Sequence, residues 1–229
     1  MEIDSFIDTR NLASLYLNNN AQVKIRSGLF DSFYNLSILN IQHNHIETLE
    51  SRCFSNFANL ILLDLRNNEL EIITHDAFVG LSQLKYLYLS SNKIRQLNEY
   101  SFLDLNNLYE LELNDNYLEF INSSIFEGLS SLEYLNLEQN KLNDFNLSFL
   151  IKNITFLSIN YSNYPIVNKV NSALEFKIIQ KLDLSNKRQR FNSRIFHSNL
   201  YLIIFNIPYF NCTITRPTNQ ISIREHFQC

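Results

Sequence analysis

The sequence predicts a repeat solenoid in which each coil contributes one short strand to a parallel sheet. Two observations carry this prediction. The stretch LLDLRNNELEII, residues 62–73, alternates like a strand and then places a pair of asparagines between two apolar runs. Related stretches recur as LYLSSNKIRQL, LELNDNYLEFI and LNLEQNKLNDF. A fixed repeat of this kind is typical of stacked coils rather than of hairpins.

The repeat is 24 residues long, and three of its recurring positions show it most clearly. One asparagine recurs at Asn20, Asn44, Asn68, Asn92, Asn116 and Asn140. One phenylalanine recurs at Phe30, Phe54, Phe78, Phe102 and Phe126. The first strand leucine recurs at Leu15, Leu39, Leu63, Leu87, Leu111 and Leu135. The unit reads LxxLxLxxNxLxxLxxxxFxxLxx, and its agreement over six copies excludes a chance match.

Each position of the unit has a physical role. The LxL segment forms a short strand whose leucines point inward. The asparagine follows where the backbone turns, and a buried amide can both donate and accept, so one per coil builds a ladder between coils. Later leucines and the phenylalanine fill the other half of the coil. A single coil cannot bury its apolar face, so neighbouring coils stack.

The repeat becomes irregular after residue 153. A seventh unit begins with Ile154, Leu157 and Ile159, and an eighth with Ile179, Leu182 and Leu184. A degenerate ninth follows at Leu200, Ile203 and Phe205. Ser162 and Lys187 stand where the asparagine belongs in the seventh and eighth units. We expect these coils to lack the amide ladder, and residues 163–177 to form an irregular excursion.

This pattern resembles the leucine-rich repeat family, in its 24-residue class, from about residue 12 to residue 208. The resemblance implies an α/β solenoid: a right-handed superhelix with a parallel concave β-sheet and an irregular or short-helical convex side. It divides the chain into a partial repeat (1–11), leucine-rich repeats (12–205) and an abbreviated C-terminal cap (206–229). Phe6 lies 24 residues before Phe30, so the chain is expected to open within a repeat. A fragment explains this, and an unusually bare end is the alternative.

The cap prediction depends on NIPYFNC, residues 206–212, which is similar to the start of the C-terminal cap of extracellular leucine-rich-repeat proteins. Of the four cysteines usual in that cap, Cys212 and Cys229 remain. The resemblance implies a disulfide between them, worth about 3 kcal/mol on a chain-entropy estimate. Two free thiols are the alternative. Cys53 precedes the repeating phenylalanine, which predicts a buried small apolar side chain.

The compartment follows from the same resemblance, which implies a receptor ectodomain or a secreted binding protein, like insect secreted immune-type proteins or Toll-like ectodomains. The alternative is a cytosolic scaffold or regulatory subunit. No signal peptide opens the chain and no apolar run reaches the membrane-spanning length. Six glycosylation sequons occur where about four arise by chance in such a composition. Asn160 projects from a strand, which leaves as candidates Asn35, Asn122, Asn146, Asn153 and Asn211.

Composition and motifs argue against catalysis and against nucleic-acid binding. The sequence contains no phosphate loop, HExxH, GxSxG or CxxC motif. His43 and His45 could share a metal ion, but solvated imidazoles at a corner are favoured because no third ligand is visible. The net charge is −4, and the basic run 187–190 is more typical of a solvated loop. We therefore expect no enzyme activity, no cofactor, no metal and no nucleic-acid partner.

A protein-binding surface remains, on the concave face. Strand side chains alternate, so the residues between the leucines share that face. The candidate binding residues are Tyr16, Asp64, Arg66, Tyr86, Tyr88, Glu110, Glu112, Tyr134, Glu138 and Phe156. Tyrosines with polar tips are typical interface anchors, and four acids are opposed by Arg66 alone. The alternative is that tyrosine serves strand propensity and cross-strand packing. The expected partner is a protein ligand or co-receptor.

Overall fold

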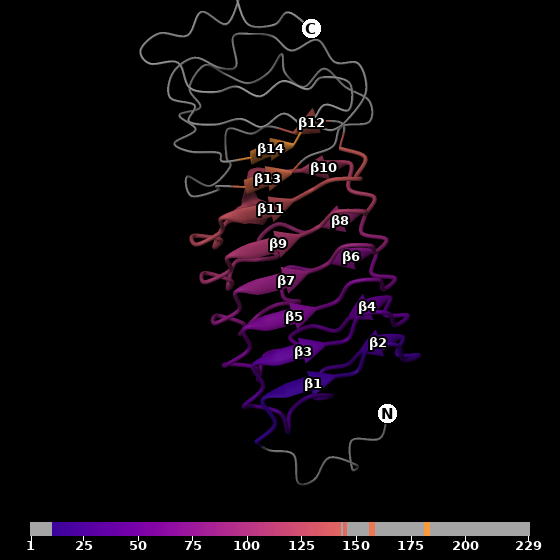
Figure 1. Cartoon of the computed structure of the whole chain (residues 1–229), viewed down its shortest axis with the longest axis vertical. Helices are drawn as coiled ribbons and strands as arrows, with labels where there is room; N and C mark the ends of the chain where they lie inside the picture. Colours follow the sequence, from indigo (N-terminus) through magenta and orange to yellow (C-terminus); the bar gives the residue numbers. More distant parts are fainter. Residues whose placement is uncertain (1–10, 143, 146–155, 159–180, 184–229) are drawn as a thin grey trace, which may run out of the picture.

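A computed structural model describes residues 11–142, 144–145, 156–158 and 181–183. In this part of the chain the coils stack along one axis, with long strands on one side and short strands on the other (Figure 1). The predicted solenoid with a parallel sheet is confirmed. The C-terminal cap, the Cys212–Cys229 pair, the irregular excursion, the ninth repeat and sequons 146, 153, 160 and 211 lie outside the described residues.

The main sheet has eight parallel strands in the order β1-β3-β5-β7-β9-β11-β13-β14. Their bounds are β1 Ser14–Tyr16, β3 Ile38–Asn40, β5 Leu62–Asp64, β7 Tyr86–Tyr88, β9 Glu110–Glu112, β11 Tyr134–Asn136, β13 Phe156–Ser158 and β14 Lys181–Asp183. Each strand pairs in register with the next coil, so Leu39 lies opposite Leu15 and Leu63. The register therefore places equivalent residues of successive coils side by side.

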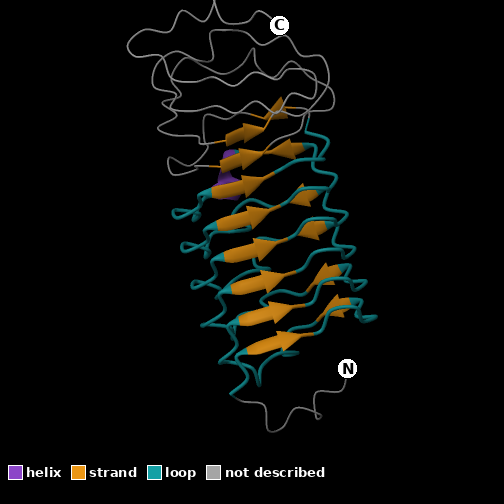
Figure 2. Cartoon of the chain, in the orientation of Figure 1, coloured by secondary structure: helices purple, strands orange, loops and turns teal. Residues whose placement is uncertain are grey.

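The opposite side of each coil carries a strand of two residues (Figure 2). These strands are β2 Lys24–Ile25, β4 Thr48–Leu49, β6 Ile72–Ile73, β8 Gln96–Leu97, β10 Phe120–Ile121 and β12 Asp144–Phe145. They pair as β2-β4, β6-β8 and β10-β12. Among the described residues, one 3-10 helix, Ser123–Phe126, adds to them. The convex side is thus built mainly from turns and very short strands.

The corner after each of the six main strands β1, β3, β5, β7, β9 and β11 has a left-handed residue directly before the repeating asparagine. These residues are Asn19, His43, Asn67, Ser91, Asp115 and Gln139, with φ between 52° and 58°. A left-handed backbone is uncommon for side chains larger than glycine. Here the neighbouring asparagine ties the corner down, so the chain turns with polar side chains and little glycine.

The asparagine ladder is made of side-chain bonds to the backbone. Asn68 Nδ2 donates to the carbonyls of Leu65, in its own coil, at 3.0 Å and of Ile41, in the preceding coil, at 3.1 Å. Its Oδ1 accepts from the N–H of Ile46 at 3.1 Å. Equivalent bonds to both coils are made by Asn44, Asn92, Asn116 and Asn140. Asn20 differs, because it is exposed and its amide donates within its own turn.

The core between the two sides is filled by leucines and by a column of stacked phenylalanines. Successive ring centroids lie 6.2 Å (Phe30–Phe54), 6.4 Å (Phe54–Phe78) and 5.9 Å (Phe78–Phe102) apart, with interplanar angles of 17°, 4° and 14°. Phe102 is completely buried. This apolar column and the amide ladder together hold the main sheet rigid, which positions the side chains on its outer face.

Candidate functional site

The first row of the concave face runs across the starts of the main strands. The register aligns Tyr86 with Glu110, Glu110 with Tyr134, and Tyr134 with Phe156. Tyr86, Glu110 and Tyr134 are each partly buried. Glu110 is therefore flanked on both sides by a tyrosine on the neighbouring strand.

Two residues that the sequence analysis did not select widen this row. Tyr109, which precedes β9, is 42% exposed and packs edge-on against Tyr86, with ring centroids 6.2 Å apart. Ile61 occupies the same repeat position before β5 and is 39% exposed. The available signal was a large apolar residue in the position before a strand, where the other described coils of the regular repeat carry Ala13, Ser37, Lys85 or Glu133. The apolar part of the face therefore extends beyond the strands themselves.

The second row contains Tyr88 and Glu112, which are aligned in the sheet. Burial, Glu110 and Glu112 together raise the pKa of Tyr88 to about 12, so its hydroxyl is protonated at neutral pH. Ser90 Oγ donates to Glu112 Oε2 at 3.3 Å. Burial and then Glu112 also raise the pKa of Tyr134. The carboxylates of this face thus raise the pKa of the neighbouring tyrosines.

Arg66, the cation that the sequence sets against the four acids of this face, is paired with Asp64. The side chain of Asp64 is 2% exposed and is held by Arg66, whose Nε and Nη2 donate to the two carboxylate oxygens at 3.0 and 2.7 Å. The Arg66 guanidinium also lies over the Tyr88 ring, 4.8 Å from its centroid. The physical reason is that a planar guanidinium satisfies a carboxylate and a ring face at the same time. Asp64 and Arg66 therefore neutralise one another.

Glu110, on the central strand β9, is a partly buried acid of the face. Burial, followed by repulsion from Glu112, raises the pKa of Glu110, and Arg66 opposes this shift. In the described residues no ion pair involves Glu110 or Glu112. The oxygen Oδ1 of Asn114, which follows β9, is also buried without a hydrogen-bond partner there. The centre of the face therefore presents the oxygens of Glu110, Glu112 and Asn114, and no described cation pairs with the two carboxylates.

The remaining predicted residues lie toward the ends of the face. Tyr16 on β1 is 60% exposed and separated from the tyrosines of β7 by two strands. Glu138 is partly buried in the coil of β11. The backbone of Phe156 continues the first row on β13. The structure thus brings together Tyr86, Tyr88, Glu110, Glu112 and Tyr134, and leaves Tyr16 apart from them.

A chain of ionic and cation–π contacts runs along the flank, away from the concave face. His45 Nδ1 lies 2.8 Å from Glu69 Oε1, and Lys93 Nζ lies 2.6 Å from Glu69 Oε2. Lys141 and Arg95 both lie over the Tyr117 ring, at 4.6 and 5.2 Å. Within the described ranges, no group of three or more His, Cys, Asp or Glu is placed to hold a metal ion.

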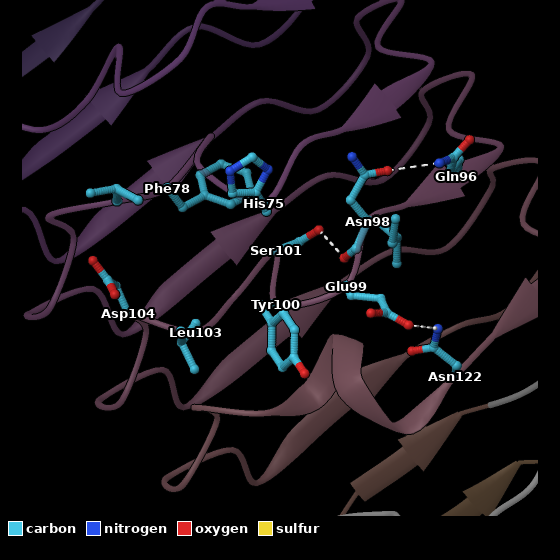
Figure 3. A pocket seen from close by; sticks show the side chains of 12 residues that line it. His75, Phe78, Gln96, Asn98, Glu99, Tyr100, Ser101, Leu103, Asp104 and Asn122 are labelled. Atoms are coloured by element: carbon cyan, nitrogen blue, oxygen red, sulfur yellow. Dashed lines mark hydrogen bonds between the residues drawn. The ribbon is translucent and has the colours of Figure 1, made fainter.

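A shallow groove of about 760 Å³ lies on the convex side (Figure 3). Exposed Tyr100 and Leu103 line it, together with polar residues that bond to one another. Ser101 Oγ donates to the carbonyl of Asn98, and Asn122 Nδ2 donates to Glu99 Oε1 at 3.4 Å. The groove is open to solvent and its polar groups partner each other, so it has fewer marks of a ligand site than the concave face.

Two of the glycosylation candidates fall in described segments. Asn35 is partly buried, whereas Asn122 is exposed at the start of the 3-10 helix. Asn122 Oδ1 accepts from Ile125 N at 3.2 Å, which leaves Nδ2 on the outside, near Glu99. Asn122 is therefore the more accessible of the two.

These features together define a leucine-rich-repeat solenoid: a 24-residue coil, an asparagine ladder, a phenylalanine column and one long parallel sheet. The chain belongs to the leucine rich repeat family, because that family model matches residues 10–70, 58–118 and 106–163. No curated protein matches the chain. Among the described residues, no helix has the length and apolar character needed to cross a membrane.

Two solved structures resemble this chain, and one of them is a leucine-rich-repeat protein. One, a protein from Leptospira interrogans, has a TM-score of 0.63 and 26% identity, and the match covers 76% of this chain and 43% of that one. The other is TLR13 in the crystal structure of its complex with ssRNA13. It has a TM-score of 0.57 and 26% identity, and the match covers 75% of this chain and 28% of TLR13. The chain spans less than half the length of either protein.

Proposed function

We propose that this chain is a non-catalytic module that recognises a protein partner on its concave face. The observation that carries the proposal is the cluster of Tyr86, Tyr88, Glu110, Glu112 and Tyr134 on adjacent, rigidly held strands. Tyrosine supplies a large contact area at a small loss of side-chain entropy, and such residues dominate many interfaces. The parallel sheet preorganises them, which reduces the entropy lost on binding.

The proposed setting is extracellular, as a receptor ectodomain or a secreted immune-type binding protein. The likeness to TLR13 and the sequence NIPYFNC near the C-terminus support this setting. A cytosolic scaffold or regulatory subunit is the alternative, and the state of Cys212 and Cys229 separates the two. An oxidising compartment favours the disulfide, whereas the cytosol keeps both thiols reduced.

A selection with a displayed random peptide library tests the proposed recognition face. Peptides selected on the wild-type protein should lose binding to the double variant Tyr86→Ala/Tyr88→Ala. They should retain binding to Phe120→Ala, which removes a 66% exposed ring from β10 on the convex side. Equal binding of every selected peptide to all three proteins would exclude the concave face as the recognition surface.

Nucleic acid is a second partner class to test, because the similar structure of TLR13 is a complex with ssRNA13. Phosphate groups require cations, and the centre of the concave face carries two carboxylates while Arg66 is bound to Asp64. We therefore expect no retardation of a labelled single-stranded RNA in a gel-shift assay at physiological salt. Retardation that Tyr86→Ala/Tyr88→Ala abolishes would replace the protein partner with RNA.

A further inference from the structure

The centre of the concave face carries two carboxylates, Glu110 and Glu112, that no described cation binds as an ion pair. Glu110 and Glu112 lie on one strand, at alternate positions that share a face. Burial, and then repulsion from Glu112, raise the pKa of Glu110. Arg66 is bound to Asp64, and among the described residues no ion pair joins a lysine or arginine to Glu110 or Glu112.

The preceding coils show how this surface binds a cation. There, a guanidinium is held by the carboxylate of Asp64 and covers the ring of Tyr88, 4.8 Å from its centroid. The same two chemical groups, carboxylate and tyrosine, meet again around Glu110, which no described arginine or lysine binds as an ion pair. Tyr86 and Tyr134 lie on the strands to either side, about 9–10 Å apart by strand spacing. The register therefore puts tyrosine positions on both sides of the Glu110 position, where a docking side chain can contact tyrosine and carboxylate together.

We propose that the concave face binds a basic segment of a partner protein, which places an arginine or lysine side chain between Tyr86 and Tyr134 over Glu110 and Glu112. This inference rests on the proposed function and specifies the partner's chemistry. The incoming cation pairs with two partly desolvated carboxylates, relieves their mutual repulsion and contacts tyrosine rings. Charge complementarity thus selects a basic segment over an acidic or purely apolar one.

A pair of defined peptides tests the proposal. The probes are fluorescent GRGRGRG and GEGEGEG, measured by anisotropy against the wild-type protein and two charge-matched variants. Glu110→Gln/Glu112→Gln removes two charges from the face. Glu71→Gln/Glu119→Gln removes two from exposed positions beside β6 and β10, on the opposite side of the coils. Thermal melts check that each variant remains folded.

The arginine peptide is expected to bind about tenfold or more weakly to the face variant, to bind the control variant as it binds wild type, and to outcompete the glutamate peptide. Equal losses in both variants would show diffuse attraction by net charge and overturn the proposal. Failure of the arginine peptide to bind wild type would overturn it as well.

The peptide selection described for the proposed function separates the two failures. Selected peptides that depend on Tyr86 and Tyr88 but show no enrichment of arginine or lysine would keep the recognition face and overturn the basic partner. Enrichment of basic residues, with binding lost in Glu110→Gln/Glu112→Gln, supports both. If no selected peptide loses binding in Tyr86→Ala/Tyr88→Ala, the recognition face is refuted. The GRGRGRG titration would then show independently whether Glu110 and Glu112 bind a cationic side chain.

Discussion

Asn92 binds the backbone of the coil before its own: its Oδ1 accepts a hydrogen bond from the N–H of Leu70 at 3.1 Å. Asn68, Asn116 and Asn140 each accept an equivalent bond from a buried backbone N–H of the preceding coil. These bonds lie where the main strand ends and the chain turns, so they stabilise the corner as well as the contact between coils.

Asn92→Ala should lower the free energy of unfolding by about 1–3 kcal/mol, because the buried N–H of Leu70 loses its partner. Urea titration followed by circular dichroism measures the change. Asn20→Ala is the matched control: Asn20 is exposed, and the change should stay within about 0.5 kcal/mol. Equal destabilisation by the two substitutions would contradict the assignment of the stability to buried rungs.

Phe102→Ala should destabilise the solenoid by about 3–5 kcal/mol, because it empties a fully buried position in the phenylalanine column. Its ring stacks on Phe78 at a centroid distance of 5.9 Å, so the cavity opens between two coils. Phe120→Ala removes the same side chain from a 66% exposed position and should be nearly neutral. A thermal melt of both variants checks the difference, and a wild-type transition for Phe102→Ala would refute the column's role.

Glu110→Gln should stabilise the chain at pH 7.5, and this gain should disappear near pH 3.5. The folded-state pKa of Glu110 is raised, so ionisation is harder in the folded than in the unfolded chain. The ionised carboxylate therefore destabilises the fold above the folded pKa, and the penalty vanishes below the unfolded pKa of about 4.3. Melting temperatures across this pH range provide the measurement, with Glu119→Gln as an exposed control. A lower melting temperature at pH 7.5 would contradict the predicted sign.

Thiol labelling should distinguish Cys53 from the other two cysteines. Burial raises the pKa of Cys53 to about 12, and its side chain is 4% exposed. Iodoacetamide at pH 8 should therefore leave Cys53 unmodified in the folded protein and modify it in guanidinium, as peptide mapping will show. In protein prepared without reductant, one thiol under denaturing conditions indicates the Cys212–Cys229 disulfide. Three thiols would exclude it and favour the cytosolic alternative.

The main sheet could be predicted because its signal recurs: inward leucines at alternate positions, one asparagine and a fixed interval. The two-residue convex strands could not, since β2, β4, β6, β8 and β10 each contain a single buried residue, such as Ile25 or Leu49, and have no periodicity to detect. The left-handed corner was equally hidden. It precedes the asparagine and accepts His43, Ser91 or Gln139, so no single residue type marks it.

The sequence could predict which strand residues belong to the candidate site, because alternate residues of a strand lie on the same face. Tyr86, Glu110 and Tyr134 are aligned by the same register that the 24-residue interval implies. The burial of Asp64 was not predictable, because it depends on a guanidinium folding back over a ring in the next coil. Tyr109 was missed because it lies outside the strand that alternation describes.

The rungs also make this molecule adjustable in length. The amides of Asn68 and Asn92 bind partners at the same sequence offsets, namely 22, 3 and 27 residues away. Duplication or deletion of a whole 24-residue unit during evolution therefore leaves the hydrogen bonds between the newly adjacent coils intact, since neighbouring coils present the same donors and acceptors. Such a change would add or remove one strip of recognition surface at a time while the remaining strips keep their spacing.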